Sequence, residues 1–161
     1  TRNLEEFVPT DVGALLAEIE TAWQASPHLD GAIADAADDP SRFAAELARR
    51  IGHPPPARRL PVRFEPGPGG PLVPVAAVRF GDTLISFLEW LALAGAGAAA
   101  VADGGAAARP GVEIRPDGWT PDGSARTLAK LRAFERRFAL AGFELAVEPS
   151  RFRLVHAAPA R

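Results

Sequence analysis

Seven basic side chains in the C-terminal third have the type and spacing to bind an anion. On a helix predicted over residues 124–141, Arg126, Lys130 and Arg137 project within about 40° of one another. The complete set is Arg126, Lys130, Arg132, Arg136 and Arg137 on this helix, and Arg151 and Arg153 on a hairpin predicted to follow it. Such a cluster can contact phosphates, so nucleic-acid binding through the helix and hairpin is one hypothesis. The alternative is a solvated face, or a face docked on the acidic first third of the chain.

Trp119 is the aromatic residue whose position suggests a binding role. It lies in a polar loop, Asp117-Gly-Trp-Thr-Pro121, between predicted elements. Two interpretations stay open: its indole fills the core from the loop, or it anchors a partner at the surface. In the second case the binding surface combines Trp119, the Pro-rich segment 53–61 and the basic helix.

A glycine pattern indicates a third kind of chemistry. The segment Gly95-Ala-Gly-Ala-Ala-Ala100 fits the spacing G-x-G-x-x-A, and Asp117 follows roughly where a dinucleotide-binding fold carries its ribose-binding acid. That motif needs a strand directly before its first glycine. Here Leu84, Leu88 and Leu91 lie on one side of a helix instead, so a nucleotide loop is disfavoured.

The apolar run that contains these glycines, residues 84–102, is also long enough for a membrane span. Glu89 interrupts it, its second half is Ala and Gly, and no basic cluster flanks one end. We therefore predict a buried central helix over residues 82–102, capped by Asp82, with no membrane contact.

Metal-binding and catalytic constellations are not recognisable. The acids Asp30, Asp35, Asp38 and Asp39 lack the alternating ligands and central glycine of a calcium loop, so capping and solvation explain them. There is no cysteine, and the three histidines are His28, His53 and His156. We expect no catalytic residue, no metal and no cofactor.

The elements that must position these side chains begin with a helical N-terminal third. Asp11 or Thr10 can cap a first helix, in which Val12, Leu16 and Trp23 belong to one apolar face. A second helix is predicted over residues 29–37 and a third from Pro40 to Ile51. The Pro-rich segment 53–61 is predicted to be an extended linker.

The rest of the chain reads as two β-hairpins, a strand and two helices. The first hairpin joins residues 62–65 to residues 72–80, and a short strand covers residues 112–115. In the last hairpin, residues 143, 145 and 147 are predicted to face residues 156, 154 and 152, with Glu148 beside Arg151. The hairpin ending in Val78–Leu84 and running into a helix resembles the start of ubiquitin-like β-grasp domains, a resemblance that carries no function.

Composition sets the class of the chain. It has 161 residues, 47% of them hydrophobic, a net charge of −2 and no cysteine, as expected for one globular domain. We predict an α+β fold with an N-terminal helical segment (1–52), a linker (53–61) and an α+β domain (62–161). The predicted function is a non-catalytic protein-interaction or accessory domain of a cytoplasmic bacterial protein, with another protein as its partner. Nucleic-acid binding is the alternative, and a small enzyme with an unrecognised carboxylate site is third.

Overall fold

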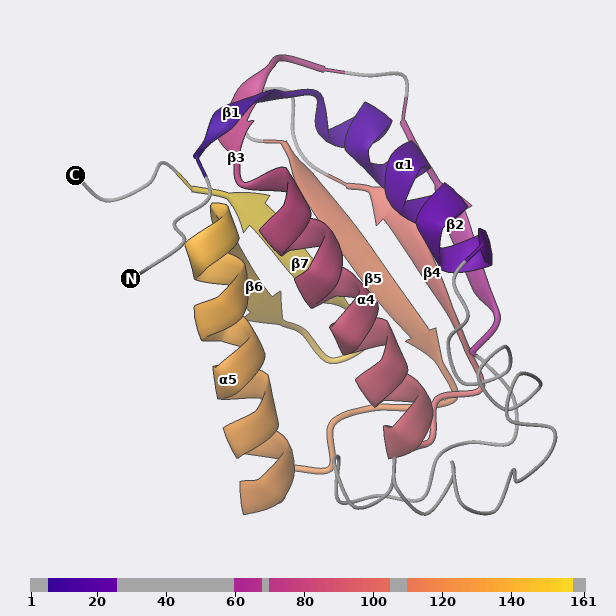
Figure 1. The fold of residues 1–161 in the computed structure, drawn as a ribbon. Helices are drawn as coiled ribbons and strands as arrows, with labels where there is room; N and C mark the ends of the chain where they lie inside the picture. Colours follow the sequence, from indigo (N-terminus) through magenta and orange to yellow (C-terminus); the bar gives the residue numbers. More distant parts are fainter. Residues whose placement is uncertain (1–5, 26–59, 68–69, 105–109, 158–161) are drawn as a thin grey trace, which may run out of the picture.

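The computed structural model describes residues 6–25, 60–67, 70–104 and 110–157. Three helices cover one face of a five-stranded sheet, and a two-stranded sheet lies at one end (Figure 1). The helices are α1 (Val12–Ala25), α4 (Ala77–Ala94) and α5 (Ala125–Ala141). The strands are β1 (Val8–Thr10), β2 (Val62–Glu65), β3 (Val73–Val75), β4 (Ala98–Asp103), β5 (Gly111–Asp117), β6 (Phe143–Val147) and β7 (Phe152–His156). The predicted α+β class is confirmed.

The large sheet has the strand order β2-β4-β5-β7-β6 and is mixed. Strand β2 pairs with β4 in parallel, and the other neighbours are antiparallel. Strands β1 and β3 form the separate small antiparallel sheet. The central helix α4 lies between α1 and α5 over the large sheet (Figure 1).

The core lies between the helices and the sheet. Along α4, Leu84, Phe87, Leu88 and Leu91 are completely buried. Trp23 of α1 is buried in the same core, so α1 belongs to the unit that the sheet forms. The predicted division at the Pro-rich segment stays a prediction.

Several local predictions are confirmed by hydrogen bonds. The carboxylate of Asp11 accepts a hydrogen bond from the amide of Gly13 at 2.9 Å, which caps α1. Helix α5 begins after Ser124 and ends at Gly142, whose φ of 105° is in the left-handed region. The last hairpin has the predicted register, with Leu145 opposite Leu154.

The predicted buried helix over residues 82–102 is placed partly wrongly. Helix α4 begins at Ala77 and ends at Ala94, and Gly95 adopts a φ of 110° as its C-cap. The alanines that follow form β4, because the sheet supplies neighbours on both sides of that strand and this outweighs the helix propensity of alanine. The predicted cap Asp82 lies inside α4. Since a helix precedes Gly95, the strand that a dinucleotide loop requires is absent from this part of the described chain.

The predicted first hairpin is also wrong. Strand β2 pairs in parallel with β4, which follows it only after α4, and residues 77–80 are the first turn of that helix. Strand β3 pairs with β1 rather than with β2. Alternation shows which residues can form a strand, but the partner is chosen by the tertiary fold. The β-grasp resemblance is therefore not supported.

The helices predicted over residues 29–37 and 40–51, and most of the linker, lie outside the described residues.

Candidate functional site

The strongest candidate site is a hollow of about 460 Å³ between the C-terminal part of α4 and the first turns of α5, which we call the α4–α5 pocket. This volume is within the range of roughly 300–1,000 Å³ that is usual for small-molecule sites. One part of its lining is apolar and consists of Trp90, Ala94, Trp119, Ala129 and Ala133. The other part is polar and consists of Asp122, Ser124, Arg126, Thr127 and Lys130.

Two indoles form the aromatic wall of the pocket. The rings of Trp90 and Trp119 meet edge to face, with centroids 5.5 Å apart at an angle of 84°. Trp90 is held from the core side by Phe87, at 5.6 Å, and by Phe134, at 5.8 Å. Because Trp90 is buried between these rings, its position is set by the core and needs no ligand.

Trp119 reaches the core from the loop after β5. Gly118, with a φ of 68°, turns the chain directly before it, a conformation that favours glycine. The half-buried indole packs on the core, 5.9 Å from the ring of Phe152. Trp119 therefore packs against the core from the loop and also lines the pocket, and its role as a binding residue stays a prediction.

The first turn of α5 supplies the polar end of the pocket. The hydroxyl of Ser124 accepts a hydrogen bond from the amide of Thr127 at 3.2 Å. The carboxylate of Asp122 accepts one from the amide of Ser124 at 2.9 Å. This backbone hydrogen bond, followed by those from the hydroxyls of Ser124 and Thr127, holds the pKa of Asp122 below its usual value. Asp122 is therefore an ionised carboxylate that shapes the start of the helix.

Two cations border the pocket and are not paired with an acid among the described residues. Arg126 and Lys130 are exposed, and neither forms an ion pair with any residue that the structure describes. Lys130 Nζ lies 5.6 Å from the centroid of the Phe134 ring. Arg137 follows Phe134 by three residues, and its Cζ lies 5.5 Å from the centroid of the same ring. Its Nη2 donates a hydrogen bond to Ser86 Oγ of α4 at 3.5 Å. The predicted row of three cations therefore faces the groove between the two helices.

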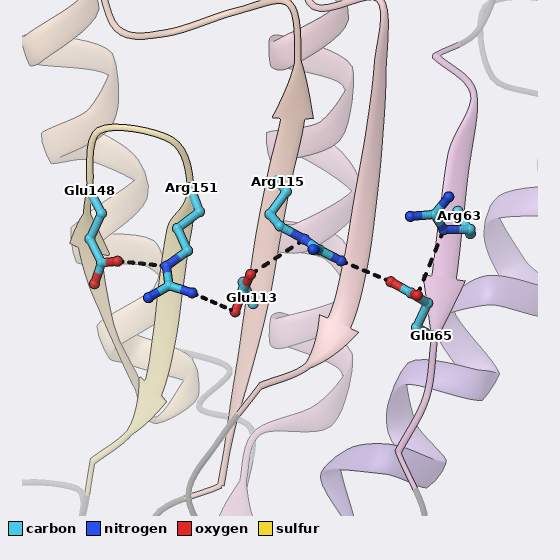
Figure 2. A network of polar contacts seen from close by, with 6 residues as sticks. All are labelled: Arg63, Glu65, Glu113, Arg115, Glu148 and Arg151. Atoms are coloured by element: carbon cyan, nitrogen blue, oxygen red, sulfur yellow. Dashed lines mark hydrogen bonds and ion pairs between the residues drawn. The ribbon is translucent and has the colours of Figure 1, made fainter.

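The other four predicted cations do not join this row. Arg132 and Arg136 are exposed on α5 and do not line the pocket. Arg153 lies on the face of the sheet opposite to the helices, because its neighbours Phe152 and Leu154 point into the core. Arg151, at the start of β7, is bound into an ion-pair network on that open face (Figure 2).

This network, which we call the charge ladder, crosses the sheet from β2 to the β6–β7 turn (Figure 2). Arg115 contacts Glu65 at 3.1 Å and Glu113 at 3.3 Å. Arg151 contacts Glu113 at 3.1 Å and Glu148 at 2.7 Å. Arg63 and Arg153 contact the ends of the ladder more loosely, at 3.8 Å and 3.7 Å. Each of these arginines is compensated by a glutamate.

Small side chains on β4 make the ladder possible. Arg63 and Arg115 are the register neighbours of Ala100, and Glu65 and Glu113 are those of Ala102. Because β4 presents only methyl groups between them, Arg115 can reach across that strand to Glu65. A second hollow, of about 330 Å³, adjoins Arg63 and Arg115. Since both arginines are already paired, it is a weaker anion site than the α4–α5 pocket.

The remaining predicted features lie elsewhere. His156 Nε2 lies 2.7 Å from the carbonyl oxygen of Pro74, which joins β7 to β3 far from the pocket. Within the described ranges there is no group of three or more His, Cys, Asp or Glu side chains that could hold a metal ion. In the same part of the chain, no helix is both long and apolar enough to cross a membrane.

Sequence reasoning missed several residues of the pocket, among them Trp90, Ala94, Ser124 and Thr127. The sequence assigns Trp90 only to the predicted central helix 82–102, and Ser124 only to the start of the predicted helix 124–141. Their common signal is positional: Trp90 and Ala94 are four residues apart, and Arg126 and Lys130 repeat that spacing on α5. The spacing predicts a face for each helix, but the sequence does not show that the two faces meet.

Solved structures of other proteins have a similar fold. This chain is similar to the ATP-binding domain of PrrB from Mycobacterium tuberculosis, with a TM-score of 0.55 and 17% sequence identity over 98% of each chain. It is also similar to the histidine kinase domain of the E. coli osmosensor EnvZ, with a TM-score of 0.53 and 13% identity over 100% of this chain and 95% of that one. No protein-family model matches the sequence, and no curated protein matches it. At these identities the likeness concerns the fold.

These likenesses contradict the functional interpretation of the sequence. The two similar structures are described as an ATP-binding domain and a histidine kinase domain. Neither is described as a non-catalytic protein-interaction or accessory domain. Nucleic-acid binding through the basic helix and last hairpin is contradicted in the same way, and its surface is divided, because Arg151 and Arg153 lie in the charge ladder. A protein partner and a cytoplasmic location stay predictions.

Proposed function

We propose that this chain is a nucleotide-binding domain and that the α4–α5 pocket is its site. The observation that carries the proposal is the combination of an aromatic wall with uncompensated cations around one hollow of about 460 Å³. The shared fold with the PrrB domain, which is described as ATP-binding, supports it. A nucleotide has the matching two parts, a flat base and an anionic phosphate chain.

The base would contact the apolar part of the lining. Trp119 is half-buried and already held by Trp90 and Phe152. A base that stacks on its indole therefore causes little further loss of side-chain conformational entropy. Ala94, Ala129 and Ala133 leave room beside the indoles, because each ends in a methyl group. A base stacked on an aromatic side chain contributes about 1–3 kcal/mol to binding.

The phosphates would contact the polar part. Arg126 and Lys130 supply cationic donors that have no acid to satisfy them among the described residues. The start of α5 adds the positive end of the helix dipole on the same side. The proposal is confined to binding and assigns no step of phosphoryl transfer, because the capping residue Asp122 supplies the only carboxylate among the described lining residues.

A titration with ATP tests the proposal. Binding is followed by isothermal calorimetry and by tryptophan fluorescence. The change in fluorescence on binding should come mainly from Trp119 and Trp90, because these two residues line the pocket. Lys130→Ala should weaken binding by about 1–2 kcal/mol, roughly 5–30-fold in Kd, because it removes one charge-assisted contact. Trp119→Phe should weaken it less than Trp119→Ala, because the phenyl ring retains part of the stacking area.

Arg132→Ala is the matched control for Lys130→Ala. It removes one positive charge from the same helix, at an exposed residue that does not line the pocket, and should change Kd less than twofold. Absence of ATP binding at millimolar concentration would show that the proposal is wrong. If Lys130→Ala and Arg132→Ala weakened ATP binding equally, the nucleotide would not be bound in the α4–α5 pocket.

A further inference from the structure

The cations of the α4–α5 pocket belong to a longer groove between two antiparallel helices. On α4, Ser86, Trp90 and Ala94 follow one another at intervals of four residues, and all three meet α5 or the pocket. Figure 1 shows α4 and α5 lying side by side over the sheet. The groove therefore has an aromatic end near Ala94, and at Ser86 the two helices are joined by the contact with Arg137.

Among the described residues of α5 that border the groove, the charged side chains are cations: Arg126, Lys130 and Arg137. The first and the last of them are eleven residues apart, or about 16 Å along the helix at a rise of roughly 1.5 Å per residue. Lys130 and Arg137 both contact the Phe134 ring, with their cationic groups 5.6 Å and 5.5 Å from its centroid. None of the three pairs with an acid in the described part of the chain. A polyphosphate lying along α5 would meet each of them in turn.

The donor set does not suit a divalent metal ion. Mg²⁺ bound with a nucleotide is usually held by one or two carboxylates in addition to the phosphates. Among the described residues that line this pocket, the single carboxylate is that of Asp122, which accepts the amide hydrogen of Ser124 and helps to begin α5. A metal on the phosphates would also cancel part of the charge that Arg126 and Lys130 attract.

We propose that the α4–α5 pocket binds the phosphate chain of a nucleotide through Arg126 and Lys130, with Arg137 as the outer contact, and that it prefers the metal-free nucleotide to its magnesium complex. This inference rests on the proposed nucleotide binding and specifies the form of the ligand. The side-chain cations take the place that a metal ion has in many nucleotide sites. The phosphate chain runs from the start of α5 toward Ser86.

The test compares ATP binding in excess EDTA with ATP binding in excess Mg²⁺, at equal ionic strength, by calorimetry on the whole chain. We expect Mg²⁺ to raise Kd about two- to fivefold, because the ligand loses part of its charge near partly exposed cations. A lower Kd in EDTA supports the inference. An equal Kd in the two buffers, or a Kd that Mg²⁺ lowers, overturns it while leaving the proposed function intact. Absence of binding in both buffers overturns the proposed function itself.

Two further measurements identify which part of the ligand is recognised. In EDTA, affinity should fall from ATP to ADP to AMP, and inorganic tripolyphosphate should displace ATP. Equal affinity for the three nucleotides, or failure of tripolyphosphate to compete, would overturn the assignment of the cations to the phosphate chain.

A charge-matched pair of variants places the effect on the groove. The double variant Arg126→Ala/Lys130→Ala should weaken ATP binding in EDTA by about 10–100-fold and abolish the difference between the two buffers. Arg132→Ala/Arg136→Ala removes the same charge from exposed positions of the same helix and should preserve both. Equal effects of the two pairs would show a general charge effect and overturn the site. Circular dichroism confirms that each variant is folded.

Discussion

Phe87 links the two helices of the pocket to the sheet, and its replacement tests the described core. It is completely buried on α4. Its ring centroid lies 5.0 Å from Phe134 of α5 and 5.0 Å from Phe152 of β7, both edge to face. It also lies 5.6 Å from Trp90 and 5.9 Å from Phe138. No other aromatic contact described here joins these three elements through one side chain.

The size of the effect follows from this environment. Phe87→Ala removes a buried ring and leaves a cavity that surrounding helices and sheet cannot easily close, so we expect a loss of about 3–5 kcal/mol. That is a large part of the roughly 5–15 kcal/mol by which a domain is stable. Phe87→Leu keeps most of the apolar volume but loses the edge-to-face geometry, and should cost about 1–2 kcal/mol.

The assay is urea unfolding followed by far-ultraviolet circular dichroism, with the free energy of unfolding compared among variants. Leu140→Ala is the control, because this α5 side chain is 57% exposed and its loss should cost less than about 0.5 kcal/mol. A loss below about 1 kcal/mol for Phe87→Ala, or an equal loss for the control, would refute the described packing of α4 on α5 and β7.

Two further predictions concern the charge ladder and the end of α5. The hydrogen bond from Arg151 holds the pKa of Glu148 below its usual value, so its stabilising contribution is present above the unfolded-state pKa and is lost as pH falls through the folded-state value. When the free energy of unfolding is measured from pH 7 down to pH 2, it should fall less for Glu148→Gln than for the wild type. Equal pH profiles of the two proteins would contradict the contact between Glu148 and Arg151. Gly142→Ala should destabilise by more than about 1 kcal/mol in thermal unfolding, because φ is 105° and the new Cβ would lie 3.1 Å from Phe7. Gly70→Ala, with open space around it, should be nearly neutral, and equal effects at the two glycines would argue against the described C-cap.

Local features of the fold were predictable where neighbouring residues decide them. The cap at Ser124, the left-handed Gly142 and the apolar stripe of α5 depend on contacts within a few residues. The apolar residues that recur at helical spacing on α5 are buried: Leu131, Phe134, Phe138 and Ala141. The last hairpin was equally predictable, since its short turn and strict alternation allow a single register to bury Leu145 and Leu154.

The state of residues 98–103 could not be predicted in this way. Alanine and glycine favour no single partner, and a run such as Ala98–Val101 is compatible with a helix by propensity. Its conversion to β4 depends on pairing with β2, more than thirty residues earlier, and with β5, which comes later in the chain. The same small side chains then permit the charge ladder, which a helix at this position would have excluded.

The class of the fold, the cation row of α5 and the helix that carries it could be predicted from the residues alone, because charge, caps and periodicity are local properties. Which cations border a hollow and which are paired with acids depends on the packing of distant elements. It directs Arg126 and Lys130 to a hollow beside two indoles and pairs Arg151 with Glu148 on the opposite face. The physical reason is that a pocket is formed by side chains from separate elements, and their meeting depends on how α4 and α5 pack on the sheet.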